Sequence, residues 1–309
     1  MANTTYPNYF LSNEIEDQFN SHLDLERFCT VDTSLTGTAG MIRKVNVYSA
    51  TNSTEKLTKG AGNTLTTEAS YVTRNYPIGL AQNRFMYYDE DAMEDPMIPV
   101  VGSRHLATDM FNTINDETYA EYMKASRVVV TSAFNFDAFA DAGAAFGFEN
   151  SEGTEIFGFV SPDDVAALRK ALKDDLKYVE AFVRTGYVGT VCGMNIYTKK
   201  DATPGKIALA TNKAVTMFIK KGTEVEQPTR AKDEANTREN WIFTRKYYVV
   251  ALTNDTQAVV VIKGSAEVSS DNSFNPSKTY YEKDGLSYVK TSKTSGNPAT
   301  LGLYEITAA

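Results

Sequence analysis

The chain has 309 residues, 42% of them hydrophobic and 23% charged, so it can bury the core of one large domain or of two moderate ones. The formal net charge of −8 at pH 7 argues against a protein that reads nucleic-acid sequence, because such proteins carry a basic patch. Two cysteines, two histidines and no bilayer-length apolar stretch argue against a disulfide framework, a usual zinc site and a membrane span, and favour a reducing compartment.

The first quarter of the chain predicts an arm and a long ribbon. Residues 1–35 show weak periodicity and predict an extended arm, with one short helix around NEIEDQFNSHL. The segments MIRKVNVYS and YVTRNY each predict a strand. Residues 49–70 between them have almost no large apolar side chains, so a ribbon turning near 59–62 lacks an apolar face of its own. Such a ribbon is either mobile or supported by something outside its own chain.

The middle of the chain predicts helices. A long helix is expected over residues 103–130, because apolar residues recur there at about 3.6-residue spacing. The segment FNFDAFADAGAAFGF predicts a short buried helix. The segment SPDD at Ser161–Asp164 predicts another helix start, since serine can cap, proline fits the first turn, and acids suit the positive end of the dipole. Apolar residues from 165 to 183 would line one face of that helix or helix pair.

The remaining elements are predicted to be mostly strands. KIALATNKAVTMFIKK is followed by two long strand candidates, WIFTRKYYVVALT and QAVVVIKG, with a turn at Asn254–Asp255. Helices and strands mix without strict alternation, which favours an α+β fold over a doubly wound sheet. The chain after Gly264 is rich in Ser, Thr, Lys and Tyr, and predicts a small separate β-rich module over residues 264–309.

The glycine-rich stretch TGYVGTVCGMNIYTKK, Thr185 to Lys200, raises the question of a phosphate loop or a nucleophile. A dinucleotide loop follows a strand and opens a helix, whereas here the predicted helix comes first. A nucleophilic Cys192 would need a histidine base, and His105 is the one candidate, on another helix. The stretch therefore predicts a helix-to-strand turn whose glycines allow close packing, with Cys192 as a small buried hydrophobe. We expect no catalytic, cofactor or metal site.

Charge is unevenly distributed, and two groups are candidates for contacts with another copy of the chain. The basic group is Arg43, Lys44, Lys56, Lys59 and Arg74, and the acidic group is Asp89, Glu90, Asp91, Glu94 and Asp95. The alternative is that these charges only solvate a surface.

The order of elements resembles the major capsid proteins of tailed bacteriophages, which share the Hong Kong 97 fold. The sequence segments that carry the resemblance are FGFVSPDDVAALRKAL, then TGYVGTVCGMNIYTKK, then the run from KIALATNKAVTMFIKK to QAVVVIKG. The resemblance covers residues 1–263 approximately, and no single motif in it is diagnostic.

The resemblance implies an assignment for each part of the chain. It implies the following regions: an N-terminal arm at 1–35, an extended β-hairpin loop at 36–82, a peripheral domain with a spine helix at 83–134, an axial domain at 135–250, a closing strand of the peripheral domain at 251–263, and the C-terminal module at 264–309. Some members of the family cross-link a lysine of the extended loop to an asparagine of a neighbour. Lys56 and Lys59 lie in that region, but no motif matches.

The resemblance also implies the partners and the location. The main partner would be the chain itself, in hexamers and pentamers of a closed icosahedral shell around double-stranded DNA. Portal and scaffolding proteins, and packaged DNA without sequence-specific contact, would be further partners, with no membrane and no cofactor. The shell would be the virion capsid, assembled in the host bacterial cytoplasm. No long charged helical leader precedes the arm, so we expect that no scaffold domain is encoded here.

Three other interpretations stay open from the sequence. An encapsulin-type nanocompartment would keep the same fold and enclose a cargo protein. An enzyme of unknown class would use Cys192 or the acidic run at Asp89–Asp95. A tail or fibre protein is suggested only by the C-terminal module, and such proteins tend to be repetitive, whereas this chain has no internal repeat.

Overall fold

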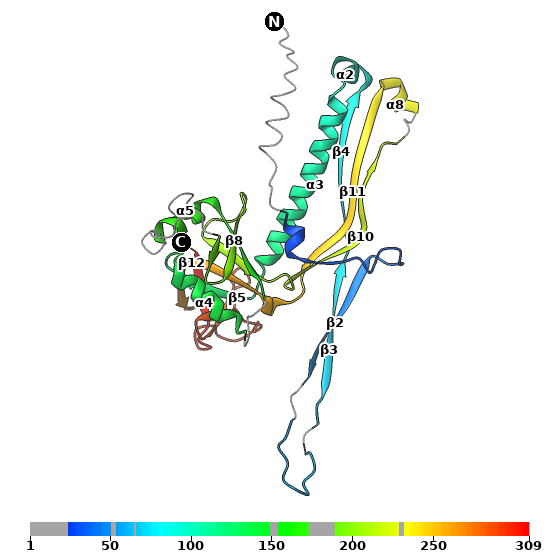
Figure 1. The fold of residues 1–309 in the computed structure, drawn as a ribbon. Coiled ribbons are helices and arrows are strands. Elements are labelled where there is room, and N and C mark those ends of the chain that lie inside the picture. Colours follow the sequence, from blue (N-terminus) through cyan, green and yellow to red (C-terminus); the bar gives the residue numbers. More distant parts are fainter. Residues whose placement is uncertain are drawn as a thin grey trace.

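The computed structural model describes residues 24–50, 54–64, 66–148, 154–172, 189–228 and 232–308. These residues form a projecting hairpin, an elongated unit built on one long helix, and a compact body (Figure 1). The α+β class predicted from the sequence is confirmed. The predicted helix around NEIEDQFNSHL lies outside the described residues.

The projecting hairpin consists of β2 (Ile42–Ala50) and β3 (Ala69–Pro77), which pair only with each other among the described strands. Both strands were predicted. Tyr48 lies opposite Tyr71 in the register, with ring centroids 5.6 Å apart, yet the two residues are 69% and 61% exposed. Cross-strand pairs of this kind supply only fractions of a kcal/mol to about 1 kcal/mol each, so the hairpin has little to stabilise it beyond its root.

The root of the hairpin is fixed to the elongated unit. Arg43 forms an ion pair with Asp32 at 3.2 Å, and the Tyr76 ring stacks on Phe218 with centroids 5.3 Å apart. Asp32 lies in the short strand β1 (Thr30–Asp32), which follows the 3-10 turn η1 (Leu25–Phe28). The direction in which the hairpin leaves the molecule is therefore set by side chains at its base.

The elongated unit packs α3 (Ile98–Tyr122) against a four-stranded sheet of order β1-β10-β11-β4. Its long strands are β4 (Gly79–Tyr88), β10 (Val215–Glu226) and β11 (Glu239–Leu252). Alternate β11 residues such as Ile242, Thr244 and Tyr248 are buried. Gly102 lets the helix approach β4, because a Cβ there would lie 2.3 Å from the Phe85 ring.

The far end of the elongated unit carries two short helices. They are α2 (Asp89–Glu94), directly after β4, and α8 (Lys232–Thr237), directly before β11. Figure 1 shows both at the end of the molecule opposite the hairpin.

The compact body contains a nine-stranded sheet of order β15-β13-β14-β5-β12-β9-β6-β8-β7 with two helices on it. The helices are α4 (Phe136–Phe146) and α5 (Pro162–Ala171), both predicted. The first six strands of the body in chain order are β5 (Arg127–Thr131), β6 (Ile156–Val160), β7 (Thr190–Val191), β8 (Met194–Thr198), β9 (Lys206–Ala210) and β12 (Ala258–Val268). As expected, Ser161 caps α5 by accepting a hydrogen bond from the Asp164 amide at 3.1 Å.

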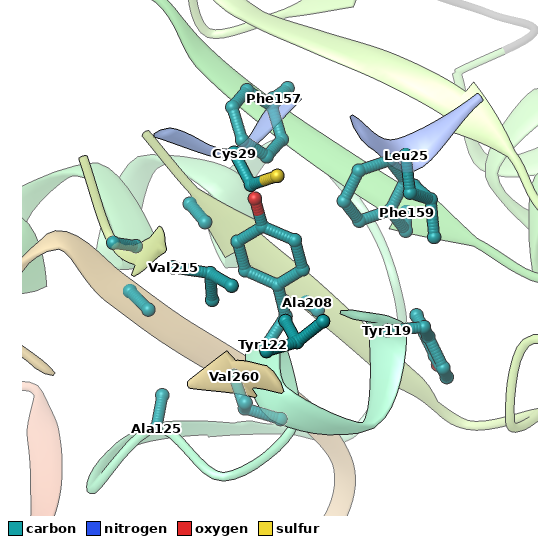
Figure 2. Close-up of a cluster of buried hydrophobic side chains, with 14 of the residues drawn as sticks. Leu25, Cys29, Tyr119, Tyr122, Ala125, Phe157, Phe159, Ala208, Val215 and Val260 are labelled. Atoms are coloured by element: carbon teal, nitrogen blue, oxygen red, sulfur yellow. The ribbon is translucent and has the colours of Figure 1, made fainter. Parts of the chain in front are cut away.

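The core continues from the body to the end of α3. Figure 2 shows the Tyr122 side chain among residues from η1, β6, β9 and β12, including Leu25, Phe159 and Val260. The hydroxyl of Tyr122 donates to the backbone oxygen of Phe28 at 2.6 Å. One hydrophobic cluster thus joins the helix of the elongated unit to the sheet of the body.

The C-terminal residues are β-rich as predicted, but the expectation of a separate module is wrong. The strands are β13 (Tyr281–Asp284), β14 (Ser287–Lys290) and β15 (Tyr304–Ala308). Strand β14 pairs with β5, β15 pairs with both β13 and β12, and β12 pairs with β5. These pairings close a ring of five strands that belongs to the body, and Gly264 of β12 lies directly opposite Ala308.

Three further expectations need correction. The long helix ends at Tyr122 rather than near 130, and Val128–Val130 form part of β5, where a β-branched run fits a buried sheet. Strands β11 and β12 do not pair across the 3-10 turn η2 (Asp255–Gln257), because each joins a different sheet. For the same reason the predicted boundary at residue 250 does not follow the sheets: β10 and β11 pack with α3, and β12 lies inside the body.

Candidate assembly surfaces

Four of the five predicted basic residues lie free on the hairpin. Lys44 and Arg74 are exposed on its strands, and Lys56 and Lys59 are exposed near its end. None of these four has an ion pair with another described residue. Arg43 differs, since its guanidinium is held at the root by Asp32 at 3.2 Å. The hairpin therefore presents a net positive charge, because Glu55 and Glu68 are its only acidic residues.

The end of the hairpin contains internal hydrogen bonds within residues 54–64. The Glu55 carboxylate accepts hydrogen bonds from the amide and the hydroxyl of Thr64, at 2.9 and 2.7 Å. Between Glu55 and Thr64, the Ala61 amide donates to the backbone oxygen of Thr58 at 3.0 Å, and Gly60 has a positive φ of 88°. The loop holds outward a Lys-Leu-Thr-Lys segment, residues 56–59, in which Leu57 is 48% exposed.

The predicted acidic group lies in and beside α2, and most of it is engaged within its own chain. Asp89 accepts from Asn240 at 2.8 Å, and Glu90 pairs with Arg238 at 2.5 Å. Asp91 and Asp95 accept backbone amides at 3.0 and 2.9 Å, which fixes the ends of the short helix. Glu94 remains exposed, with no partner among the described residues. Because α2 and the hairpin lie at opposite ends of the molecule, the two charged groups do not meet within one chain (Figure 1).

A second acidic surface was not predicted from the sequence. A groove of about 660 Å³ lies between β4, β11 and the C-terminal half of α3. Its helical side carries Asp109, Glu117 and Glu121, of which Glu121 forms an ion pair with Lys124 at the same groove, and its floor includes Met110, Ala81 and Val250. The signal in the sequence is the spacing of Asp109, Thr113, Glu117 and Glu121, which recur every four residues and so share one helix face.

The groove also contains a buried polar group. Tyr248 is 4% exposed and lines the groove next to Glu117. Burial raises the pKa of the Tyr248 hydroxyl above its ordinary value, and the Glu117 carboxylate raises it further. The Glu117 carboxylate lies beside this hydroxyl, although no hydrogen bond of good geometry joins the two groups. The hydroxyl therefore stays protonated and keeps a hydrogen to donate.

The structure describes residues 189–200 of the glycine-rich stretch. There β7 and β8 form a hairpin whose turn is Cys192 and Gly193. Cys192 and Gly193 both have positive φ, 49° and 76°, as in a type I′ turn. The expectation that this glycine allows close packing is wrong, since a Cβ on Gly193 would meet nothing within 4 Å. Its role is conformational, and Cys192 is half-buried rather than fully buried.

Neither thiol is activated. Burial, followed by the charge of Asp137, raises the pKa of Cys192. Burial, followed by the charges of Glu26 and Asp24, raises the pKa of Cys29 to about 12. Both shifts keep the less reactive thiol form at neutral pH. In the part of the chain that the structure describes, no group of three His, Cys, Asp or Glu residues is arranged to hold a metal ion. No helix in that part is long and apolar enough to cross a membrane.

Comparisons with known proteins identify the fold. The sequence matches no family model and no curated protein. Among solved structures, a chain from the capsid of the cyanophage P-SCSP1u is 13% identical with a TM-score of 0.60, covering 79% of this chain and 88% of that chain. A chain from the mature capsid of bacteriophage PhiM1 is 11% identical with a TM-score of 0.61, covering 76% of this chain and 85% of that chain.

An encapsulin is similar as well. A chain from the SrpI encapsulin complex of Synechococcus elongatus is 14% identical with a TM-score of 0.57, covering 80% of this chain and 89% of that chain. These similarities extend over most of every chain compared, so this protein has the Hong Kong 97 capsid fold, as the sequence predicted.

Proposed function

We propose that this chain is the major capsid protein of a tailed phage, a structural subunit that self-assembles into an icosahedral shell. The observation that carries the proposal is the β2–β3 hairpin, which is exposed on both faces and pairs with no other described strand. An isolated two-stranded hairpin is marginally stable in water. A second copy of the chain lying against it would supply the missing contacts, and in a closed shell these repeat around every subunit.

The proposal assigns roles to the other charged surfaces. With a net charge of −8, the wall of the shell would not bind packaged DNA tightly, so contacts with DNA would be independent of sequence. Hexamers and pentamers would form the shell, with portal and scaffolding proteins as further partners. The virion capsid would be its location, after assembly in the cytoplasm of the host bacterium.

The expected regions are kept in this proposal with two changes. Residues 1–35 would be the arm, 36–82 the extended loop, and 83–134 the start of the peripheral domain. Strands β10 and β11 are assigned to the peripheral domain because they share a sheet with β4 beneath α3. Strand β12 and residues 264–309 are assigned to the axial domain, since they complete the five-stranded ring of the body.

Electron microscopy of the purified protein, alone and together with a scaffolding protein, tests the proposal. We expect uniform closed particles tens of nanometres wide. A protein that stays monomeric at every concentration under both conditions would contradict it.

An encapsulin-type compartment is the second candidate, favoured by the similarity to the encapsulin chain. The two functions differ in content rather than in fold. Particles purified from the native source should contain double-stranded DNA if the protein is a phage capsid, and a single cargo protein if it forms a nanocompartment.

A further inference from the structure

We propose that a hollow at the open end of the β13–β14 hairpin binds an acidic saccharide, a sugar whose ring carries a carboxylate. The hollow has a volume of about 460 Å³, and its lining comes from residues 274–294, all of which the structure describes. This volume lies within the range of small-molecule sites. The proposal goes beyond the shell-forming function and is independent of it, because one chain supplies the whole site.

The pairing of β13 with β14 places the two sides of the hollow next to each other. Tyr281 lies opposite Lys290 in the register, so the chain enters and leaves the hairpin at the same end. The Thr291 amide donates to the backbone oxygen of Tyr280 at 3.0 Å, which extends this pairing by one step. One wall of the hollow therefore comes from the chain before β13, and the other from the end of β14 and the chain after it.

The aromatic part of the hollow is Phe274. Its ring packs edge-on against the buried ring of Tyr280, with centroids 5.1 Å apart. Tyr280 is itself fixed, because its hydroxyl donates to Asp271 at 2.6 Å and accepts from the Asn275 amide at 3.1 Å. Phe274 is only half-buried, so part of its ring is open to a ligand. The C–H groups of a sugar ring suit such a surface, since the face of an aromatic ring carries negative partial charge.

Polar groups without a partner surround this ring. The side-chain oxygen of Asn275 accepts from the amide and the hydroxyl of Ser277, at 3.0 and 2.7 Å, which fixes the side chain and leaves its NH2 group to donate. The hydroxyls of Thr279 and Thr294 also line the hollow, and neither has a hydrogen bond to another described residue. A ligand with many hydroxyl groups can donate to and accept from all of these groups.

The hollow carries one uncompensated positive charge. The Lys278 ammonium is held by Asp271 and Glu305, each at 2.9 Å, and Lys293 pairs at 3.1 Å with a carboxylate of β13. Lys290 is exposed and forms no ion pair within the part of the chain that the structure describes. This single charge matches one carboxylate. A nucleotide could stack on the same aromatic ring, but its phosphate monoester carries close to two charges at neutral pH and fits less well.

Saturation-transfer-difference NMR on the unassembled full-length subunit tests the proposal. The probes are glucuronate and galacturonate, with glucose and galactose as neutral counterparts that lack the carboxylate. We expect the two hexuronates to bind with Kd values of about 1–10 mM, as is usual for ligands of this size. Glucose and galactose should bind at least about threefold more weakly, because they cannot pair with Lys290.

Substitutions separate the two halves of the site. Lys290→Gln should abolish the preference for hexuronates and leave the weaker binding of the neutral sugars unchanged. Lys283→Gln is the matched control, because Lys283 is exposed near the other end of the same hairpin and does not line the hollow. Phe274→Ala should weaken the binding of all four sugars by about threefold or more, whereas Phe274→Tyr keeps the ring and should not.

The decisive variant is Lys290→Gln, since replacing an exposed side chain without an ion pair leaves the fold intact even if Phe274→Ala does not fold. The proposal is overturned if no hexuronate binds at about ten times the expected Kd, or if hexuronates and neutral sugars bind equally well. Unchanged hexuronate binding by Lys290→Gln, or tighter binding of adenosine monophosphate than of either hexuronate, would also overturn it. Each of these results is independent of whether the protein forms shells.

Discussion

The hydroxyl of Tyr122, the last residue of α3, donates a 2.6 Å hydrogen bond to the backbone oxygen of Phe28 in η1. The Phe28 ring in turn lies 4.9 Å from the Phe157 ring of the body. This bond therefore lies where the long helix, the start of the described chain and the body meet. Burial raises the pKa of the tyrosine, with the neighbouring Cys29 adding to the effect, so the hydrogen is retained at all physiological pH values.

Tyr122→Phe should lower the free energy of unfolding by about 1–3 kcal/mol, because the Phe28 carbonyl then loses its buried partner. Chemical denaturation of the unassembled subunit measures the loss. The control is Tyr48→Phe, which should change nothing because the exposed Tyr48 hydroxyl has no hydrogen bond to another described residue. An unchanged midpoint for Tyr122→Phe would show that the bond is not a structural connection.

Gly102→Ala should loosen the packing of α3 on the sheet. The added methyl group would lie 2.3 Å from the Phe85 ring. Overpacking of this kind lowers the free energy of unfolding by about 1–3 kcal/mol. Gly222→Ala, where a Cβ meets nothing within 4 Å, is the matched control. Adding Phe85→Leu, which replaces the ring with a smaller side chain, should recover part of the lost free energy of unfolding. No recovery would indicate a cause other than this contact.

Gly264→Ala should detach β15 from β12. A Cβ at this position would lie 2.0 Å from the backbone oxygen of Thr307, which cannot move without breaking the strand pairing. Hydrogen exchange at residues 304–308 should rise to the rate of an unpaired chain, while α4 and β9 stay protected. Unchanged protection of β15 would contradict the closed ring of strands.

The ion pair at the hairpin root predicts a dependence on pH. Burial alone would raise the pKa of Asp32, but hydrogen bonds from Ser34 and the charge of Arg43 outweigh it and hold the pKa below 3.8. Because the folded state has the lower pKa, the carboxylate contributes stability above pH 3.8, and this is lost as the pH falls through the folded pKa. Asp32→Asn should remove that part of the pH dependence. Denaturation curves between about pH 2 and pH 5 measure it, and identical pH profiles for the two proteins would refute the assignment.

Local patterns in the sequence were enough to predict the hairpin strands, the Ser161 cap and α4. The alternation in MIRKVNVYS and YVTRNY, and the S-P-D-D start, each depend on neighbours within a few residues. The end of α3 was missed because Val129 fits the helical period although it lies in β5. The pairing of β5 with β12 and with β14, both far away in the chain, distinguishes the two structures.

The partition of strands between sheets could not be derived locally. Strands β11 and β12 are consecutive and equally apolar, and the short η2 turn between them resembles a hairpin connection. Their different partners, β4 and β5, are chosen by packing on α3 and on the body. The groove escaped prediction for the same reason, since Gly79–Asn83, Asp109–Lys124 and Tyr248–Val250 come together only in the folded chain.

The central claim is that the β2–β3 hairpin needs a second copy of the chain to hold its structure. Hydrogen exchange of residues 42–50 and 69–77, measured in assembled particles and in unassembled subunits, tests it most directly. We expect the amides of both strands to exchange nearly as an open chain does in the subunit, and at least about a hundredfold more slowly in the particle. Equal and strong protection in the lone subunit would contradict the claim.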